Sequence, residues 1–251
     1  MTKVILHGCN GRMGQVITRL VDKDDSVEIV AGVDLNLDLN NKYSVYNDIN
    51  DCKEEADVII DFANAVAVDN LLEYARTRKI PVVLCTTGLS EEQIKKVDEV
   101  SKEVAILYSA NMSLGINTLF KILSSVSSLL SNAGFDIEIV EKHHNQKLDA
   151  PSGTALALAD VINNELNGEL EYVYNRSDVR QKRGKKELGI SAVRGGTIVG
   201  EHEIIFAGEE EVIEIKHTAY SRNVFAKGAI EAAKFLKGKE PKKYTMREVV
   251  E

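Results

Sequence analysis

Residues 3–34 read KVILHGCNGRMGQVITRLVDKDDSVEIVAGVD, and this stretch decides the fold of the first half of the chain. The apolar run Lys3–Leu6 is typical of a buried strand, Gly11–Val21 has helical periodicity, and Val27–Val33 is a second strand pattern. A strand, a helix and a second strand in this order predict a βαβ unit with parallel strands and a right-handed crossover.

Glycines mark the turn between the first strand and the helix. Gly8, Gly11 and Gly14 permit a tight turn and close approach of the backbone to a ligand, and the N-terminus of the helix offers N–H groups to a pyrophosphate. Asp34 ends the second strand, where a carboxylate accepts hydrogen bonds from ribose hydroxyls. A glycine turn that merely packs the helix on the strand is the alternative. The residues expected to contact a nicotinamide dinucleotide are Gly8, Cys9, Asn10, Gly11, Arg12, Met13 and Asp34.

The residue after Asp34 bears on the choice of cofactor. Asp34 would repel a 2′-phosphate, and Leu35 stands where an arginine could have paired with one. We therefore expect NADH to be preferred, with NADPH possible.

Strand and helix patterns go on alternating up to Leu107. Strands are expected at 57–61, 81–84 and 104–107, with helices at 66–78 and after the capping box Ser90–Gln93. Two loops follow strands of this series and should face the same crevice, although turn formation alone would also explain them. Their residues are Cys85, Thr86 and Thr87 in one loop, and Ser109, Ala110, Asn111 and Met112 in the other.

The pattern changes after Asn111, and we place a domain boundary near Ser113. Helices are expected at 116–130 and 152–166, a strand at 136–140, and a hairpin formed by 197–206 and 212–219. This composition is mixed α+β. The final helix, 223–236, has an apolar face suited to packing back on the first sheet.

The segment EKHHNQKLDAPSGTA, residues 141–155, concentrates titratable side chains between a strand and a helix. Ser152, Gly153 and Thr154 begin the helix and form an anion site of N–H and hydroxyl groups. His143, His144 and Lys147 are acid-base or cationic groups beside it. These groups could bind the two carboxylates of a dicarboxylate.

Three other interpretations of this segment remain. It could be a surface loop with a serine N-cap. It could be a metal site of Glu141, His143 and His144, although neighbours on a strand point to opposite faces and no usual ligand spacing is present. Ser152 could be a nucleophile, although no GxSxG elbow surrounds it. Proton transfer beside a hydride donor fits the residue types better, and we expect no metal.

Bulk properties narrow the class of protein. The chain has 251 residues and a net charge of -8, which disfavours nucleic acid and anionic membranes as partners. The basic stretch 181–187 is interpreted as a solvated loop. Three separated cysteines indicate neither disulfides nor a zinc site, and neither a signal peptide nor an apolar run of eighteen residues is present. We expect a cytoplasmic protein.

Four motifs resemble those of the dihydrodipicolinate (4-hydroxy-tetrahydrodipicolinate) reductases of the diaminopimelate and lysine pathway. They are GCNGRMG at 8–14, CTTG at 85–88, SANMSLGIN at 109–117 and EKHHNQKLDAPSGTA at 141–155, of which the last is the most specific. The resemblance continues through RGGTIVGEHEIIF at 194–206 and HTAYSRNVFAKGA at 217–229. Cys85 departs from the usual glycine, and Leu35 from the phosphate-binding arginine of some members.

The resemblance implies an α/β protein with two domains. A Rossmann dinucleotide-binding domain with a parallel sheet would comprise residues 1–113 and 222–251. Residues 114–221 would form an α+β substrate and oligomerisation domain with an open mixed sheet, in a homotetramer. His143 and Lys147 would be the acid-base pair, and His144 would hold substrate carboxylates with Ser152, Gly153 and Thr154, assisted by Arg222.

The implied reaction is the NAD(P)H-dependent reduction of a cyclic imine dicarboxylate. The substrate, 4-hydroxy-tetrahydrodipicolinate, loses water to give dihydrodipicolinate, receives hydride at ring carbon C4, and is protonated to tetrahydrodipicolinate. A non-catalytic NADH sensor, or a Rossmann oxidoreductase acting on another substrate, would share the dinucleotide fold.

Overall fold

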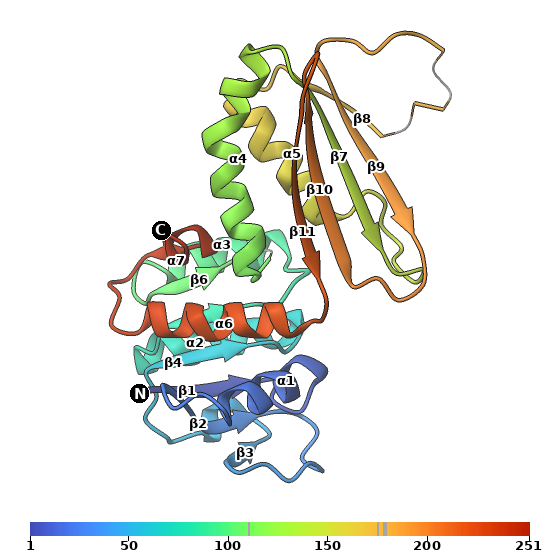
Figure 1. The fold of residues 1–251 in the computed structure, drawn as a ribbon. Coiled ribbons are helices and arrows are strands. Elements are labelled where there is room, and N and C mark those ends of the chain that lie inside the picture. The colour runs from blue at the N-terminus through green and yellow to red at the C-terminus, as the bar shows by residue number, and fades with distance from the viewer. Residues whose placement is uncertain (110, 175, 178–179) are drawn as a thin grey trace. The chain divides into compact units, whose positions relative to one another are not determined.

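The computed structural model describes residues 1–109, 111–174, 176–177 and 180–251 (Figure 1). The chain forms two compact units. The first unit comprises Met1–Leu114 and Asn223–Glu251, and the second unit comprises Gly115–Arg222. The predicted Ala110 lies outside the described residues.

The first unit is built on a parallel sheet of seven strands in the order β12-β6-β5-β4-β1-β2-β3. The bounds are β1 Thr2–His7, β2 Val27–Val33, β3 Ser44–Tyr46, β4 Val58–Asp61, β5 Val82–Leu84, β6 Ile106–Tyr108 and β12 Lys243–Tyr244. The strand order reverses between β1 and β4, the usual place for a ligand crevice in such sheets. The predicted Rossmann-like parallel sheet is confirmed, while β3 and β12 are short strands that the sequence analysis missed.

Alternation along β1 divides the first unit into two apolar layers. Val4 and Leu6 pack with α1 and α6, whereas Ile5 packs on the opposite face with α2 and α3. The helices are α1 Arg12–Val21, α2 Val68–Arg78, α3 Glu91–Val100, α6 Asn223–Leu236 and α7 Met246–Val249, with 3₁₀ turns at Ile49–Asp51 and Ala65–Ala67. As its apolar face predicts, α6 packs against the first sheet.

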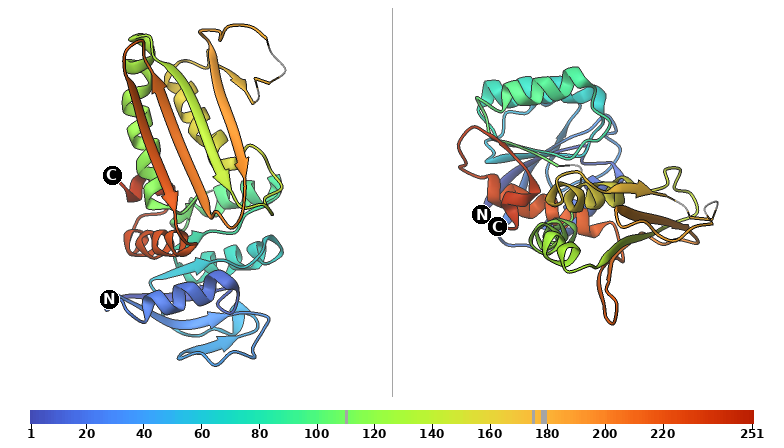
Figure 2. Two further views of the ribbon diagram at one scale, coloured as in Figure 1. Left: turned by 45° about the vertical axis from the view of Figure 1, so that its right-hand side comes forward. Right: turned by 90° about the horizontal axis from the view of Figure 1, so that it is seen from above.

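The second unit contains a mixed sheet of five strands in the order β11-β10-β7-β9-β8. Its elements are α4 Leu114–Asn132, β7 Asp136–His143, α5 Gly153–Glu165, β8 Glu171–Val173, β9 Glu187–Arg194, β10 Gly200–Ala207 and β11 Val212–Ala219. β10 runs antiparallel to β7 and β11, while β9 runs parallel to β7 and β8. Helices α4 and α5 cover one face of the sheet, where their apolar side chains pack on β7, β9 and β10 (Figure 2).

Three features of the second unit differ from the sequence-based expectations. β7 continues past Val140 to His143, and β8 and β9 were not predicted. The basic stretch 181–187 is more than a solvated loop, because Arg183 donates hydrogen bonds to Glu138 Oε1, Asp136 Oδ1 and the Ile137 carbonyl. These partners precede Arg183 by some 45 residues, so the local charge pattern could not predict the contacts.

Helix α4 is long and apolar enough to cross a membrane by length and composition alone. Its buried residues recur at helical spacing, however, at Ile116, Leu119, Leu123 and Ser127. Leu119 and Leu123 belong to the apolar cluster beneath the sheet. We therefore interpret α4 as a core helix of the second unit.

Candidate active site

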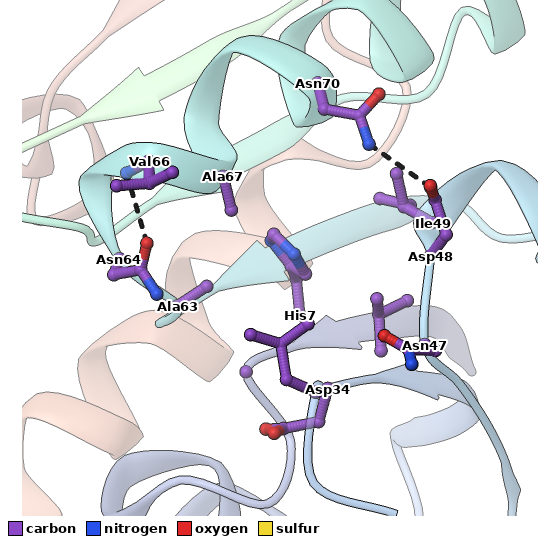
Figure 3. A pocket seen from close by; sticks show the side chains of 13 residues that line it. His7, Asp34, Asn47, Asp48, Ile49, Ala63, Asn64, Val66, Ala67 and Asn70 are labelled. Atoms are coloured by element: carbon purple, nitrogen blue, oxygen red, sulfur yellow. Dashed lines mark hydrogen bonds between the residues drawn. The ribbon is translucent and has the colours of Figure 1, made fainter.

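A pocket of about 610 Å³ lies at the carboxyl end of the first sheet (Figure 3). It is bounded by the ends of β1 and β2, by residues 47–49, and by the segment that leads into α2. Gly8 and Asp34, two of the predicted cofactor residues, line it. The location matches the crevice expected from the strand order.

The glycine turn brings α1 close to the end of β1. Gly8 has a φ of +78°, and a Cβ there would approach the Phe62 carbonyl oxygen to 2.8 Å. A Cβ on Gly14 would lie 2.3 Å from the Gly8 carbonyl oxygen. Gly11 is the N-cap of α1 and supplies no side-chain cap, so backbone N–H groups at this helix terminus suit an anionic ligand.

Asp34 is anchored by two backbone donors. Its Oδ2 accepts a hydrogen bond from Asn10 N at 2.8 Å, and its Oδ1 accepts one from Asn36 N at 2.9 Å. Each oxygen of a carboxylate has a further lone pair. The side chain can therefore accept ribose hydroxyls while it fixes the glycine turn.

The remaining predicted cofactor residues occupy different settings. Arg12 and Thr87 are exposed, Met13 is half-buried, and Ser109 Oγ donates to the Asn111 carbonyl oxygen. Cys9, Cys85 and Met112 belong to the core of the first unit. Burial raises the pKa of the Cys9 thiol to about 12, so a ligand contact from this residue would come from its backbone.

A polar network that was not predicted from the sequence lies beneath the pocket. His7 Nδ1 lies 2.7 Å from Asp61 Oδ1, and Thr86 Oγ1 donates to Asp61 Oδ2 at 2.5 Å. The Asp61 carboxylate is fully buried at the end of β4. It joins the ends of β1, β4 and β5 by side-chain hydrogen bonds.

The second unit gathers its site around Glu141, whose side chain is fully buried on the helix-covered face of β7. Glu141 Oε2 accepts from His143 Nδ1 at 2.5 Å, and Oε1 accepts from Ser152 N at 2.9 Å. Both terminal guanidinium nitrogens of Arg194, Nη1 and Nη2, donate to this carboxylate, at 2.7 and 2.6 Å. Arg194 also donates to the Asp149 carbonyl oxygen. One carboxylate thus ties β7 to β9, to the N-terminus of α5 and, through Arg194, to the intervening loop.

Burial and hydrogen bonding set the pKa values of Glu141 and His143. Burial alone would raise the pKa of Glu141, but hydrogen bonds from Arg194, His143 and Ser152 hold it below its usual value. Burial lowers the pKa of His143 and outweighs the opposing effect of Glu141. At neutral pH the cluster is therefore an ionised glutamate beside a mostly neutral imidazole with its Nδ1 proton on the glutamate side.

Ser152 caps α5 and contacts a second buried histidine. Its Oγ accepts a hydrogen bond from Ala155 N at 3.1 Å and lies 3.1 Å from His202 Nε2. The rings of His143 and His202 meet edge to face, with centroids 5.2 Å apart. Burial, with a smaller contribution from His143, lowers the pKa of His202 to about 4.

The other predicted catalytic and substrate-binding residues come from the loop after β7, the first turn of α5 and the link after β11. Lys147 Nζ forms an ion pair with Asp149 Oδ1 at 2.8 Å, and Lys147 N donates to the His144 carbonyl oxygen. Gly153 and Thr154 form the first turn of α5. Arg222 is exposed after β11, in the link to α6.

The contacts of residues 141–155 bear differently on the three alternative interpretations of this segment. Ser152 is the N-cap of α5, as the first alternative predicted, but the residue is buried and does not lie on a surface loop. His202 contacts Ser152, but its Nδ1 has no partner among the described residues, so no third group orients it as a base. Within the described ranges, no group of three or more His, Cys, Asp or Glu side chains is arranged to hold a metal ion.

Three contributors to the second-unit site were not predicted from the sequence: Glu141 as its hub, Arg194 and His202. Strand alternation was the available signal for Glu141, because it places Glu141 and His143 on one face once β7 extends to residue 143. Arg194 lies 53 residues from Glu141, and no local pattern links them.

A Rossmann-like sheet, joined to a second unit that carries buried acid-base residues beside a helix N-terminus, defines a two-unit oxidoreductase. Family models described as "Dihydrodipicolinate reductase, N-terminus" and "Dihydrodipicolinate reductase, C-terminus" match residues 2–112 and 115–250. The chain therefore belongs to the dihydrodipicolinate reductase family, as its motifs indicated.

Named relatives agree with this assignment. The chain is 55% identical to the 4-hydroxy-tetrahydrodipicolinate reductase of Caldanaerobacter subterraneus subsp. tengcongensis, over 100% of this chain and 98% of that protein. It is 50% identical to the enzyme of the same name from Clostridium novyi, again over 100% and 98%. A dipicolinate-bound dihydrodipicolinate reductase from Paenisporosarcina sp. TG-14 shares the fold, with a TM-score of 0.82 at 23% identity over 98% of this chain and 97% of that one.

Replacing Glu141 should destabilise the second unit. Glu141→Gln leaves the Arg194 charge without its buried counter-charge, and we expect a loss of about 3–5 kcal/mol in the free energy of unfolding. Glu138→Gln is the matched control, because Glu138 lies on the other face of β7 in a partly exposed pair with Arg183 and should cost about 1 kcal/mol or less. Denaturant unfolding measures both, and equal losses would contradict the hub role of Glu141.

His202 should make stability depend on pH. Because the folded state depresses the pKa of His202 to about 4, the unfolded state binds more protons between that pH and about 6.5. Stability should therefore fall as pH drops through this range, by up to about 3 kcal/mol. Unfolding measured at pH 7 and pH 5 should show a smaller difference in His202→Gln than in the wild type. An unchanged difference would argue against the buried neutral His202.

Proposed function

We propose that this protein reduces 4-hydroxy-tetrahydrodipicolinate, through dihydrodipicolinate, to tetrahydrodipicolinate in the diaminopimelate and lysine pathway. The observation that carries the proposal is the Glu141 cluster, which joins His143 to the N-terminus of α5 by hydrogen bonds in a chain of this reductase family. An acid-base group and an anion site are thereby held together, as reduction of a dicarboxylate requires.

The substrate carboxylates bind at the start of α5. Backbone N–H groups there, with the hydroxyls of Ser152 and Thr154, suit an oxyanion, and Gly153 leaves open space where a Cβ would stand. Ser152 Oγ accepts from Ala155 N, which favours directing its own proton to another acceptor. His144 and Arg222 supply further donors.

The cofactor supplies hydride to ring carbon C4, and the chain must then supply a proton to the resulting enamine at C3. Lys147 is our first choice of donor, because His143 has a lowered pKa and is mostly neutral at pH 7. His143 shares the role by accepting and passing a proton at Nε2, since its Nδ1 faces Glu141. Asp149 holds the Lys147 ammonium through their ion pair.

The dinucleotide binds at the carboxyl end of the first sheet. The turn Gly8–Met13 takes the pyrophosphate, Asp34 takes the adenosine ribose, and the loops Cys85–Thr87 and Ser109–Met112 take the nicotinamide half. NADH is preferred, with NADPH possible, because the lining of the pocket includes Asp34, Leu35 and Asp48 but neither lysine nor arginine among the described residues.

The proposal extends to a homotetrameric assembly in the cytoplasm. The second-unit sheet is covered by helices on one face, and its other face carries Val140, Ile205 and the partly exposed Val193. That face suits pairing with further copies in a homotetramer. The acidic net charge and the small anionic substrate fit a cytoplasmic enzyme without nucleic-acid or membrane partners.

Variants of the proton donors should lose turnover. We expect Lys147→Ala and His143→Ala each to lower kcat roughly 10²- to 10⁴-fold, the usual effect of general acid catalysis. Lys142→Ala is the control, because Lys142 pairs with Glu201 instead of joining the Glu141 cluster. Absorbance of NADH reports the rate while the substrate forms in situ from pyruvate and aspartate semialdehyde. Near-normal turnover in both variants would sink the assignment.

Position 35 should control the choice between NADH and NADPH. Leu35 is exposed at the rim of the pocket, so Leu35→Arg places a cation where a 2′-phosphate would lie. We expect the variant to bind NADPH roughly tenfold more tightly than the wild type. Leu37→Arg adds the same charge at an exposed position outside the pocket lining and should have little effect. Fluorescence titration with both cofactors measures the change, and equal gains in the two variants would contradict a local role.

A further inference from the structure

His7 forms part of the pocket that the proposed function assigns to the adenosine half of the cofactor. It is the last residue of β1, directly before Gly8, and its side chain is 9% exposed. In Figure 3 its ring lies in the middle of the lining residues, with Asp34, Asp48 and Ala67 around it. A polar ring almost removed from water needs hydrogen-bond partners.

The network beneath His7 fixes which ring nitrogen carries the proton. Asp61 accepts from Thr86 Oγ1 and Ala63 N, which is the pattern of an ionised carboxylate. His7 Nδ1 must therefore donate to Asp61 Oδ1. In the neutral ring Nε2 is then a hydrogen-bond acceptor.

The rest of the pocket suits a flat ring that bears a donor. Apolar side chains of Leu35, Ile49 and Val66 line it. Its charged side chains are the carboxylates of Asp34 and Asp48, which also accept hydrogen bonds. Acceptors between apolar walls match the exocyclic amino group of a purine.

We propose that His7 Nε2 accepts a hydrogen bond from the 6-amino group of the cofactor's adenine and so selects adenine over hypoxanthine. The proposal rests on the proposed function, because it assumes a nicotinamide adenine dinucleotide in this pocket. Hypoxanthine carries a carbonyl oxygen at the same position, so two acceptors would face each other and one would stay unsatisfied.

Binding of NADH and its hypoxanthine analogue tests the role of His7. The wild type should bind NADH roughly tenfold to a hundredfold more tightly than the analogue, as measured by fluorescence titration without substrate. His7→Ala should reduce this ratio to below about threefold. Val66→Ala, which trims an apolar wall, should weaken both ligands and keep the ratio. A wild-type ratio near one, or a full ratio in His7→Ala, would overturn the proposal.

A second variant keeps a flat ring at position 7 but removes the hydrogen-bond acceptor. In His7→Phe no ring atom can accept from the 6-amino group of adenine. The preference for NADH should then be lost as in His7→Ala, and an unchanged preference for NADH would contradict the proposal. Wild-type protein that oxidises NADH without discriminating the two bases would sink this inference alone, whereas absence of NADH binding would sink the proposed function as well.

Discussion

The buried carboxylate of Glu141 is the interaction on which the second unit's site depends. A fully buried charge is tolerable only when it is paired and hydrogen-bonded, and here Arg194, His143 and Ser152 N supply four donors. These partners come from β7, β9 and the start of α5, so satisfying one charge brings together His143 and the N-terminus of α5, which are the proposed acid-base residue and anion site. The need to satisfy this charge also sets the tautomer of His143, with the Nδ1 proton toward the carboxylate and Nε2 as the unprotonated nitrogen.

The first unit also has a buried, hydrogen-bonded carboxylate, at the carboxyl end of its own sheet. Asp61 is fully buried and accepts hydrogen bonds from His7, Thr86 and Ala63 N. In each unit a buried carboxylate near the end of a strand thus accepts a hydrogen bond from a histidine and orients its imidazole ring. Such pairing preorganises the side chains before a ligand arrives, and preorganisation is the main source of electrostatic stabilisation in enzymes.

Local sequence patterns predicted much of this protein. Glycine spacing, strand alternation and the helix cap at Ser152 act within a few residues, so the βαβ unit, the Rossmann-like sheet and the start of α5 could be inferred. β8 has only three residues, and β9 buries only two large apolar side chains, Leu188 and Ile190, so neither gives a strong local pattern. Their places in the sheet are set by the pairing of β8 with β9 and of β9 with β7. The hubs were missed because their partners are distant in the chain: Arg194 lies 53 residues from Glu141, and Asp61 lies 54 from His7. Sequence patterns singled out candidate acid-base residues but not the carboxylates that orient the histidines.

The central claim is that this chain transfers hydride from a nicotinamide dinucleotide to ring carbon C4 of a cyclic imine dicarboxylate. The most direct measurement uses NADH that carries deuterium at the transferred position of the nicotinamide, with substrate formed in situ and the product analysed by mass spectrometry and NMR. The account predicts tetrahydrodipicolinate with one deuterium at C4. A product without deuterium, deuterium at another carbon, or no oxidation of the cofactor would contradict it.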